Sequence, residues 1–290
     1  MHPSLTEKIQ VMRNANNVLL LLVIFTACSP INRQNKIKHT FDAANQKLED
    51  AYFEDAIVLY SKVLELDHEI VDAYMNRGVA YFETGHYALA LADYNHVRQM
   101  KPEFHGILFN RINAYMEMNR MEMAATDIDF LKTIYPDTAL IWNVEGLMFG
   151  KQKDYMRGKA SFKIALAKDA RNFDAAVNLG VMHFHLNEFD SAELALTKAL
   201  KLHENAPEAL NPLSLALLHQ GKLDEADAVI DKAIALVRDQ PYFLNNKGLI
   251  QIHKGKYELA DSLITQSLKL DPTNQSALDN SRLLKEKQND

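Results

Sequence analysis

The 290-residue sequence has a single cysteine, Cys28, and no basic tract. One cysteine excludes an intrachain disulfide framework, which suits an exported protein that uses no disulfides. The formal net charge of −6 argues against nucleic-acid binding, because that binding depends on neutralising phosphates with lysine and arginine. The apolar stretch over residues 18–27 has only ten residues, whereas a membrane-spanning helix needs about 20.

An apolar stretch of this length is typical of the core of a signal peptide. Lys8 and Arg13 precede it as a positively charged region, and Thr26 and Ala27 lead directly into Cys28. The segment resembles a bacterial lipoprotein signal, whose lipobox commonly reads Leu-Ala/Ser-Gly/Ala-Cys. Phe25 departs from the usual aliphatic residue of that box.

The resemblance implies that residues 1–27 are removed and that Cys28 carries acyl chains, so that residues 28–36 form a lipid-anchored tether. Two or more acyl chains anchor a protein stably where one is marginal. Ser29 follows the cysteine, and in the enteric sorting rule this residue type directs a lipoprotein to the outer membrane. The alternatives are a cleaved soluble protein with an idle cysteine, or an uncleaved anchor.

A 34-residue period begins at Ile37 and continues without insertion. It predicts seven repeats, over residues 37–70, 71–104, 105–138, 139–172, 173–206, 207–240 and 241–274. Position 20 of the repeat is small in all seven: Ala56, Ala90, Ala124, Gly158, Ala192, Ala226 and Ala260. Position 17 is large and apolar in all seven, and position 8 is small in six. Small residues at positions 8 and 20 allow two antiparallel helices to approach closely.

This pattern resembles the tetratricopeptide repeat (TPR), most clearly in AYMNRGVAYFETGHYALALADY, residues 73–94. The resemblance implies an all-α fold, a right-handed TPR solenoid of seven helix-turn-helix repeats with a C-terminal capping helix. Residues 275–290 supply that helix, which becomes charged where a solenoid needs a solvated end. Glycine or asparagine at position 15 predicts a left-handed cap where the first helix of a repeat, helix A, ends.

The sequence lacks the motifs of common enzymes: it has no glycine-rich phosphate loop, no G-x-S-x-G and no H-E-x-x-H. An uninterrupted repeat also leaves no insertion in which a catalytic cleft can be built, so we expect no enzyme, no cofactor and no small-molecule substrate. His185, His219 and His253 recur at position 13. Neighbouring helices lie about 8–10 Å apart, too far to share a zinc ion with bonds of about 2.1 Å. We therefore interpret these histidines as polar groups near a groove rim, and an enzyme-associated role as a less favoured alternative.

The groove formed by the A helices has an apolar patch at positions 5 and 12. Its members are Phe41, Met75, Phe82, Phe109 and Met116. A helix that is apolar on two faces must bury both or offer one to a partner. The patch therefore predicts a site for an apolar segment of a protein or peptide, and the alternative is that neighbouring helices cover much of this second stripe.

Asparagine recurs at position 6 on the same side of helix A: Asn76, Asn110, Asn178, Asn246 and Asn280. Asparagine is a poor residue for the middle of a helix, and its amide complements one peptide unit. The series resembles the asparagine ladder of the TPR domain in the O-linked N-acetylglucosamine transferase, which grips peptide backbone. The alternative is that these amides only bond to neighbouring helices.

These features together predict a membrane-anchored TPR scaffold on the periplasmic face of the outer membrane of a bacterium. It would bind a protein or peptide segment in its concave groove and support the assembly or recruitment of cell-envelope proteins. A pilotin-like assembly factor for an outer-membrane secretion or pilus complex is the alternative that the sequence leaves open.

Overall fold

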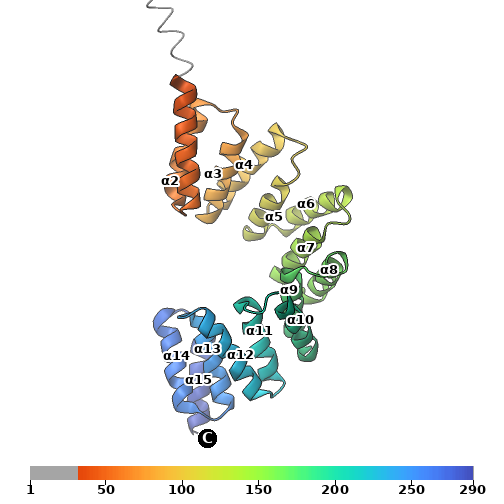
Figure 1. Cartoon of the computed structure of the whole chain (residues 1–290), viewed down its shortest axis with the longest axis vertical. Coiled ribbons are helices and arrows are strands. Elements are labelled where there is room, and N and C mark those ends of the chain that lie inside the picture. Colours follow the sequence, from red (N-terminus) through yellow and green to blue (C-terminus); the bar gives the residue numbers. More distant parts are fainter. Residues whose placement is uncertain (1–31, 290) are drawn as a thin grey trace, which may run out of the picture. The chain divides into compact units, whose positions relative to one another are not determined.

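The computed structural model describes residues 32–289, which form α-helices and turns and contain no strand (Figure 1). Cys28 and the predicted signal peptide lie outside this part of the chain. The first helix covers residues 32–49, and α2–α15 follow it. Their bounds are α2 Phe53–Leu66, α3 Val71–Glu83, α4 Tyr87–Met100, α5 Ile107–Glu117, α6 Met121–Ile134, α7 Ala139–Lys151, α8 Tyr155–Lys168, α9 Phe173–His185, α10 Phe189–Leu202, α11 Pro207–His219, α12 Leu223–Leu236, α13 Pro241–His253, α14 Tyr257–Leu270 and α15 Gln275–Asn289.

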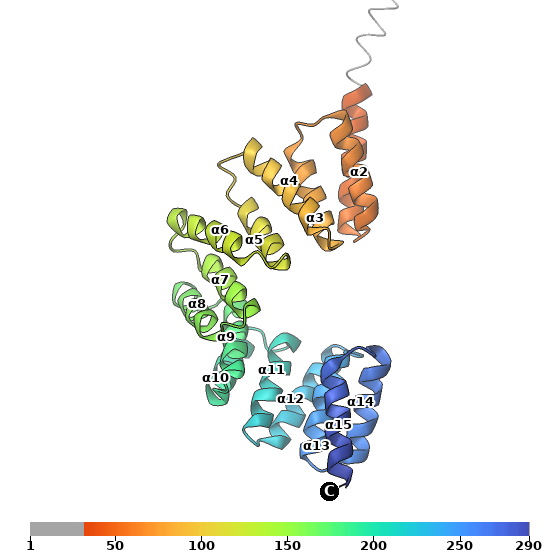
Figure 2. The ribbon, with the colours of Figure 1, turned by 180° about the vertical axis from the view of Figure 1, so that it is seen from behind.

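The chain divides into two compact units, and the division falls inside α6, between Asp127 and Ile128. In the described part of the first unit, α2 packs on α3 and α4 packs on α3 and α5. In the second unit each helix from α7 to α14 packs on the next, and α15 covers α13 and α14. Figures 1 and 2 show these neighbours side by side within each unit.

The helices follow the predicted repeats closely. Helices α3, α7, α9, α11 and α13 begin at the first residues of their predicted repeats, and α5 begins at Ile107, two residues after its own. The start of the chain differs from the expectation. The first helix already covers residues 32–36, so this part of the predicted tether is helical.

Helix A ends in the same way in every repeat. All seven residues at position 15 have a positive φ, between 55° and 77°: Ala51, Gly85, Asn119, Lys153, Asn187, Gly221 and Gly255. This left-handed conformation lets the chain reverse direction and lets the following N–H groups donate hydrogen bonds to the last carbonyls of the helix. Gly85, for example, donates its N–H to the carbonyl of Phe82 at 3.0 Å. Ala51 and Lys153 adopt the conformation although it disfavours a side chain.

Position 8 of helix A packs directly against position 24 of helix B, the second helix of the repeat. A Cβ atom built on Gly78 would lie 2.5 Å from Cε1 of Tyr94, and one built on Gly180 would lie 2.5 Å from Cγ of Leu196. Tyr94 and Leu196 are buried. The small residue therefore makes room for the large one, and this contact sets the distance between the two helices of a repeat.

Substitution at position 20 tests this packing. Ala192 is fully buried in α10, so Ala192→Leu should overpack the contact between α9 and α10 and lower the free energy of unfolding by about 1–3 kcal/mol. The control is Ala160→Leu on the exposed face of α8, which should leave stability nearly unchanged. Chemical denaturation of both variants measures the difference, and equal stabilities would contradict the assigned packing.

Candidate protein-binding surface

The apolar patch predicted for the groove lies on the A helices of the first unit. Phe41 is on the first helix, Met75 and Phe82 are on α3, and Phe109 is on α5. All four side chains are half-buried, so each packs on one side and retains accessible surface on the other. Phe41 packs edge-on against Tyr60 with ring centroids 5.8 Å apart. The packing fixes this ring in place, while its remaining surface is available to a partner.

Met116 is buried and is therefore not part of this accessible patch. Its side chain is only 7% exposed, because the end of α5 is covered and Met116 joins the core there. The sequence-based assignment of Met116 as a binding residue is therefore corrected. Position 12 faces the groove in α3 and is covered in α5, and the 34-residue period alone does not distinguish the two.

Three of the five asparagines in the position 6 series bond to the preceding repeat. Asn76 Nδ2 donates to Asn45 Oδ1 at 3.1 Å, and Tyr60 OH donates to the same oxygen at 2.6 Å. In the second unit, Asn246 Nδ2 donates to Asn211 Oδ1 at 2.8 Å and Asn280 Nδ2 donates to Asn245 Oδ1 at 2.9 Å. These amides tie one A helix to the next, so part of the series has a structural role.

The remaining two asparagines, Asn110 and Asn178, form no side-chain hydrogen bond with any residue among 32–289. Both are half-buried. Asn143 lies 35 residues before Asn178, the same separation as in the two linked pairs of this unit. Its Oδ1 atom is buried without a hydrogen-bond partner in the described chain. Asn110 and Asn178 are thus the members of the series whose amides are free to bind a partner.

Two of the three histidines at position 13 pack on aromatic rings of the preceding repeat. His185 stacks on Tyr155, with centroids 4.4 Å apart and planes 9° apart, and His219 stacks on Phe189 at 4.7 Å and 7°. For His253 the corresponding residue of the preceding repeat is Leu223, which has no ring. Stacking between repeats therefore accounts for His185 and His219. Within residues 32–289, no group of three or more metal-ligating side chains comes together.

Partial burial also changes the titration of two of these histidines. It lowers the pKa of His185, and together with the nearby charge of His253 it lowers the pKa of His219. Each imidazole keeps an exposed edge, so solvent moderates both effects. The neutral imidazole is the form that the folded protein favours.

Charged residues join the two helices inside a repeat in the first unit. Arg77 on α3 binds Asp93 on α4 through two bonds of 2.8 Å, and this carboxylate raises the pKa of Arg77. Arg111 and Asp127 repeat the arrangement one repeat later, at 3.2 Å. Burial raises the pKa of Asp127, and the charges of Arg111 and Arg98 oppose that increase. These pairs hold helix A to helix B within their repeats.

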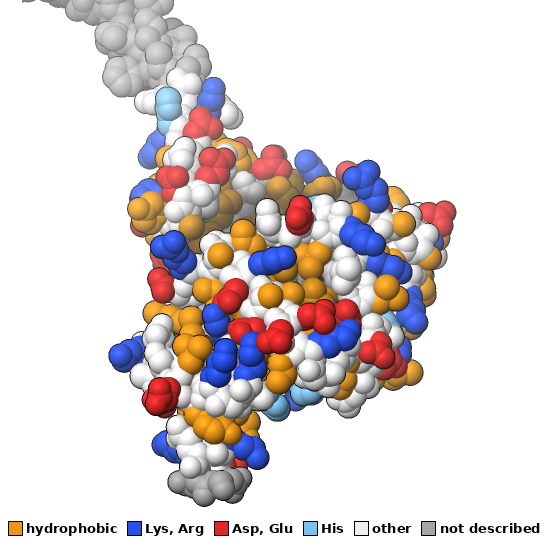
Figure 3. Space-filling model, turned by 60° about the horizontal axis from the view of Figure 1, so that its bottom comes forward, with side chains coloured by type: hydrophobic (Ala, Val, Ile, Leu, Met, Phe, Trp, Pro, Cys, Tyr) orange, Lys and Arg blue, Asp and Glu red, His pale blue; other side chains and the backbone are white. Residues whose placement is uncertain are grey.

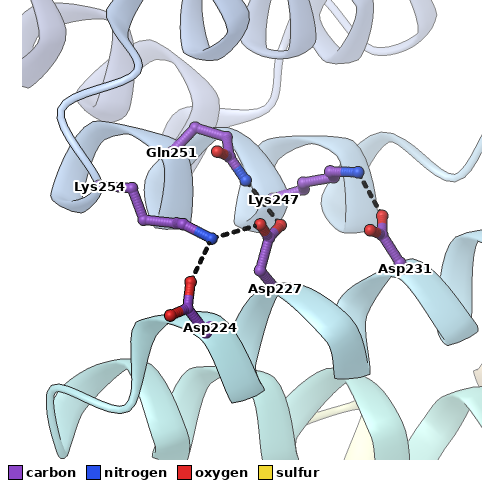
Figure 4. Close-up of polar contacts among 6 residues, drawn as sticks. All are labelled: Asp224, Asp227, Asp231, Lys247, Gln251 and Lys254. Atoms are coloured by element: carbon purple, nitrogen blue, oxygen red, sulfur yellow. Dashed lines mark hydrogen bonds and ion pairs between the residues drawn. The ribbon is translucent and has the colours of Figure 1, made fainter.

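A second kind of polar contact joins consecutive repeats. Lys254 on α13 lies 2.8 Å from Asp224 and 2.7 Å from Asp227, both on α12 (Figure 4). Gln251 Nε2 donates to Asp227 at 2.6 Å. From the sequence alone, Asp224 and Asp227 are expected to be part of a solvated face. The structure corrects this for Asp227, which is half-buried and holds α12 to α13.

Charges of both signs share the face drawn in Figure 3, and none of the described helices meets the requirements of a membrane-spanning segment. On the face shown in Figure 3, basic and acidic side chains lie among one another, with hydrophobic side chains between them. No helix within residues 32–289 is both long enough and apolar enough to cross a membrane. The half-buried apolar patch and the free asparagine amides are suitable for a protein or peptide.

Family models identify the class of the protein. Models of tetratricopeptide repeats match residues 52–85, 71–104, 144–207, 186–241 and 241–274, which together cover more than half of the chain. The chain therefore belongs to the TPR family, as the 34-residue period predicted, and its all-α TPR fold is confirmed. This class of fold supports an interaction scaffold and is typically non-enzymatic. No curated protein sequence matches the chain.

Solved structures with a similar fold are distant in sequence. A chain of the APC/C Cut9–Hcn1 hetero-tetramer has a TM-score of 0.69 at 14% identity; the match covers 83% of the present chain and 48% of that one. A TPR protein from Parabacteroides merdae has a TM-score of 0.68 at 15% identity, with 86% and 99% covered. PilW, a type IV pilus biogenesis factor, has a TM-score of 0.64 at 21% identity, with 72% and 97% covered. At these identities the likeness shows the fold alone.

The two stacked histidines predict a pH dependence of stability. Because their pKa values are lower in the folded state, the unfolded chain binds more protons as the pH falls below about 6.5, and folding is weakened there. The double variant His185→Phe/His219→Phe keeps a ring at each position and removes the titration. We expect the melting temperature of the wild type to fall more between pH 7.5 and pH 5 than that of the variant. Equal falls would exclude these two groups as the cause.

Proposed function

We propose that the chain is a lipid-anchored TPR scaffold that binds an extended segment of a cell-envelope protein along the A helices of its first unit. The observation that carries the proposal is the position of Asn110 beside Phe109 on α5: a free amide next to a half-exposed ring. Met75 and Phe82 extend the apolar surface on α3, which contacts α5.

An extended segment suits this surface for geometric reasons. An asparagine amide offers one donor group and one acceptor, which is the complement of a peptide unit. Equivalent positions of successive repeats are separated by about 10 Å, and an extended chain advances about 3.3 Å per residue. Every third residue of such a segment can therefore bond to an asparagine while its side chains contact the apolar patch. Asn76 retains the acceptor oxygen of its amide for this purpose, although its amide nitrogen is bonded to Asn45.

The sequence before residue 32 supports the lipid anchor and the location in this proposal. Cys28 at the end of a short apolar stretch supports acylation, and Ser29 supports retention on the periplasmic face of the outer membrane. A scaffold tethered in this way would recruit or assemble other proteins of the bacterial envelope. Protein partners and the membrane surface are then its two points of attachment.

A pilotin-like role in assembling an outer-membrane secretion or pilus complex is a second candidate. The similarity in fold to PilW favours it, because the match covers 97% of a protein that acts in type IV pilus biogenesis. An enzyme-associated role of the histidine series loses support, since His185 and His219 are occupied in stacking.

Separate substitutions of two asparagines distinguish binding from structure. Asn110→Ala removes a free amide, so we expect capture of the partner to fall at least fivefold while the melting temperature stays unchanged. Asn76→Ala breaks the link to Asn45, so we expect a loss of about 1 kcal/mol in the free energy of unfolding. Crosslinking in intact cells, followed by mass spectrometry of the enriched proteins, measures capture.

The matched control is Asn95→Ala on α4, a helix B position outside the groove. It should leave both capture and stability unchanged. Capture at the wild-type level by Asn110→Ala would contradict the ladder, and a destabilised Asn110→Ala would indicate a structural role for this amide as well.

Acylation of Cys28 is tested independently of binding. Metabolic labelling with a fatty-acid analogue should mark the wild-type protein and leave Cys28→Ser unlabelled. The serine variant should also move from the membrane fraction to the soluble fraction. Label retained by Cys28→Ser would contradict the lipoprotein hypothesis.

A further inference from the structure

A hollow in the second unit lies between two B helices, α8 and α10, with the A helix α9 as its floor. Its volume is about 640 Å³. Ala176, Leu179 and His183 line the floor at spacings of three and four residues, so they share one face of α9. They are nearly buried, at 4%, 9% and 7% exposure, whereas Leu194 on the wall is 58% exposed. We call this hollow the Ala176 groove.

The groove lies where one residue departs from the repeat. Position 4 of helix A is large in five of the other repeats, where it is occupied by Tyr74, Leu108, Trp142, Leu210 and Leu244. In two of those repeats, the large side chain is seen to reach a flanking B helix. The Tyr74 ring lies 4.1 Å from the His96 ring on α4, and Lys132 on α6 lies 4.0 Å above the Trp142 ring. In the fifth repeat this position is the small Ala176, which lines the hollow.

The surrounding helices do not close over this space. Gly180, one turn along α9, is in contact with Leu196 of α10, and the ion pair of Lys159 with Glu188 at 2.7 Å joins α8 to the start of α10. These contacts fix the distance between the helices whether or not position 4 is filled. A cavity that cannot collapse remains open to a side chain from another molecule.

The rim of the groove is basic. Lys163 on α8 and Lys198 and Lys201 on α10 line it, and no aspartate or glutamate does. None of the three lysines forms an ion pair within residues 32–289, whereas the nearby Lys159 and Lys168 are paired with Glu188 and Asp137. In a chain with a net charge of −6, three unpaired lysines around one apolar hollow create a local positive potential.

The carboxylate that contacts the floor of the groove is already paired. Glu188 accepts from Lys159 at 2.7 and 3.0 Å and is also hydrogen-bonded to Nδ1 of His183, the last residue of the floor. These bonds lower the pKa of Glu188, so its carboxylate remains ionised and paired with Lys159. His183 is thereby held against the α9–α10 turn, and the lysines on the rim face solvent.

We propose that the Ala176 groove binds an acidic segment of a partner protein, which inserts one large apolar side chain over Ala176. Lysines stand on both walls, so they match a segment that carries carboxylates on either side of its apolar residue. A lipid with a single anionic head would place charge at one end only. This site is separate from the groove of the proposed function, since it uses B helices of the second unit.

Peptide selection with a filled variant tests the proposal. Phage-displayed random peptides are selected on the full-length wild-type chain after depletion on Ala176→Trp, which fills the hollow as Trp142 does one repeat earlier. Depletion removes peptides that bind elsewhere, including the groove of the first unit. We expect the enriched peptides to carry aspartate or glutamate on both sides of a large apolar residue.

An enriched peptide, synthesised with a fluorescent label, is then titrated by anisotropy. Lys198→Glu/Lys201→Glu should weaken its binding at least tenfold. Lys232→Glu/Lys269→Glu changes the net charge equally on exposed parts of α12 and α14 and should leave binding within twofold. Ala176→Leu, which reproduces the residue of repeats 3, 6 and 7, serves as a second filled variant if circular dichroism shows that the tryptophan disturbs folding.

Three outcomes would overturn the proposal. The first is that no selected peptide binds the wild type more tightly than it binds both filled variants. Another is enrichment of peptides without acidic residues, or binding that the lysine substitutions leave unchanged. The third is binding of the wild type, but not of Ala176→Trp, to phosphatidylglycerol vesicles without any peptide selected, which would assign the groove to lipid.

Discussion

Close approach of the two helices of each repeat is the constraint on which the rest of the structure depends. In six of the seven repeats a small residue at position 8 lies opposite a large one at position 24, as in Gly78 with Tyr94 and Gly180 with Leu196. Close approach also requires a small residue at position 20, where Ala192 is fully buried. Once this distance is fixed, the hydrogen bonds, ion pairs and ring stacks between helices form at nearly constant geometry from repeat to repeat. Variation in function must then come from side chains added to this frame.

Most of the regularly spaced polar residues hold repeats together. The stacks of His185 on Tyr155 and of His219 on Phe189 have nearly the same geometry because the backbone beneath them repeats. The same holds for the bonds that Asn246 and Asn280 donate to the preceding helices. A polar residue that recurs with the period of a solenoid meets the same neighbours each time, and those neighbours are usually its partners. Periodicity of a polar group is therefore weak evidence for ligand binding in this fold.

Much of the fold could be predicted from the sequence. The 34-residue spacing identifies the residues at which helices end and the small residues that lie between paired helices. The starts of α3, α7, α9, α11 and α13 fall at the predicted residues. What could not be predicted depends on how side chains pack around each helix. The covering of Met116, the link from Asn76 to Asn45 and the pairing of Asp227 with Lys254 are examples. Their side-chain positions are set by local packing, which the repeat pattern of a single sequence does not encode.

Exceptions to the repeat are the more informative sites. Asn110 matters because its amide lacks the link that Asn76, Asn246 and Asn280 make. Ala176 matters because it places a small side chain beside a hollow, where the preceding repeat has Trp142. The second exception was visible in the sequence as the one alanine at position 4, but its consequence depends on whether the surrounding helices collapse. They are kept apart by the contact between Gly180 and Leu196 and by the pair of Lys159 with Glu188. The same rigidity that makes the repeats uniform therefore preserves a hollow where one side chain is missing, and a binding site can arise from a loss of volume in a scaffold that cannot adjust to it.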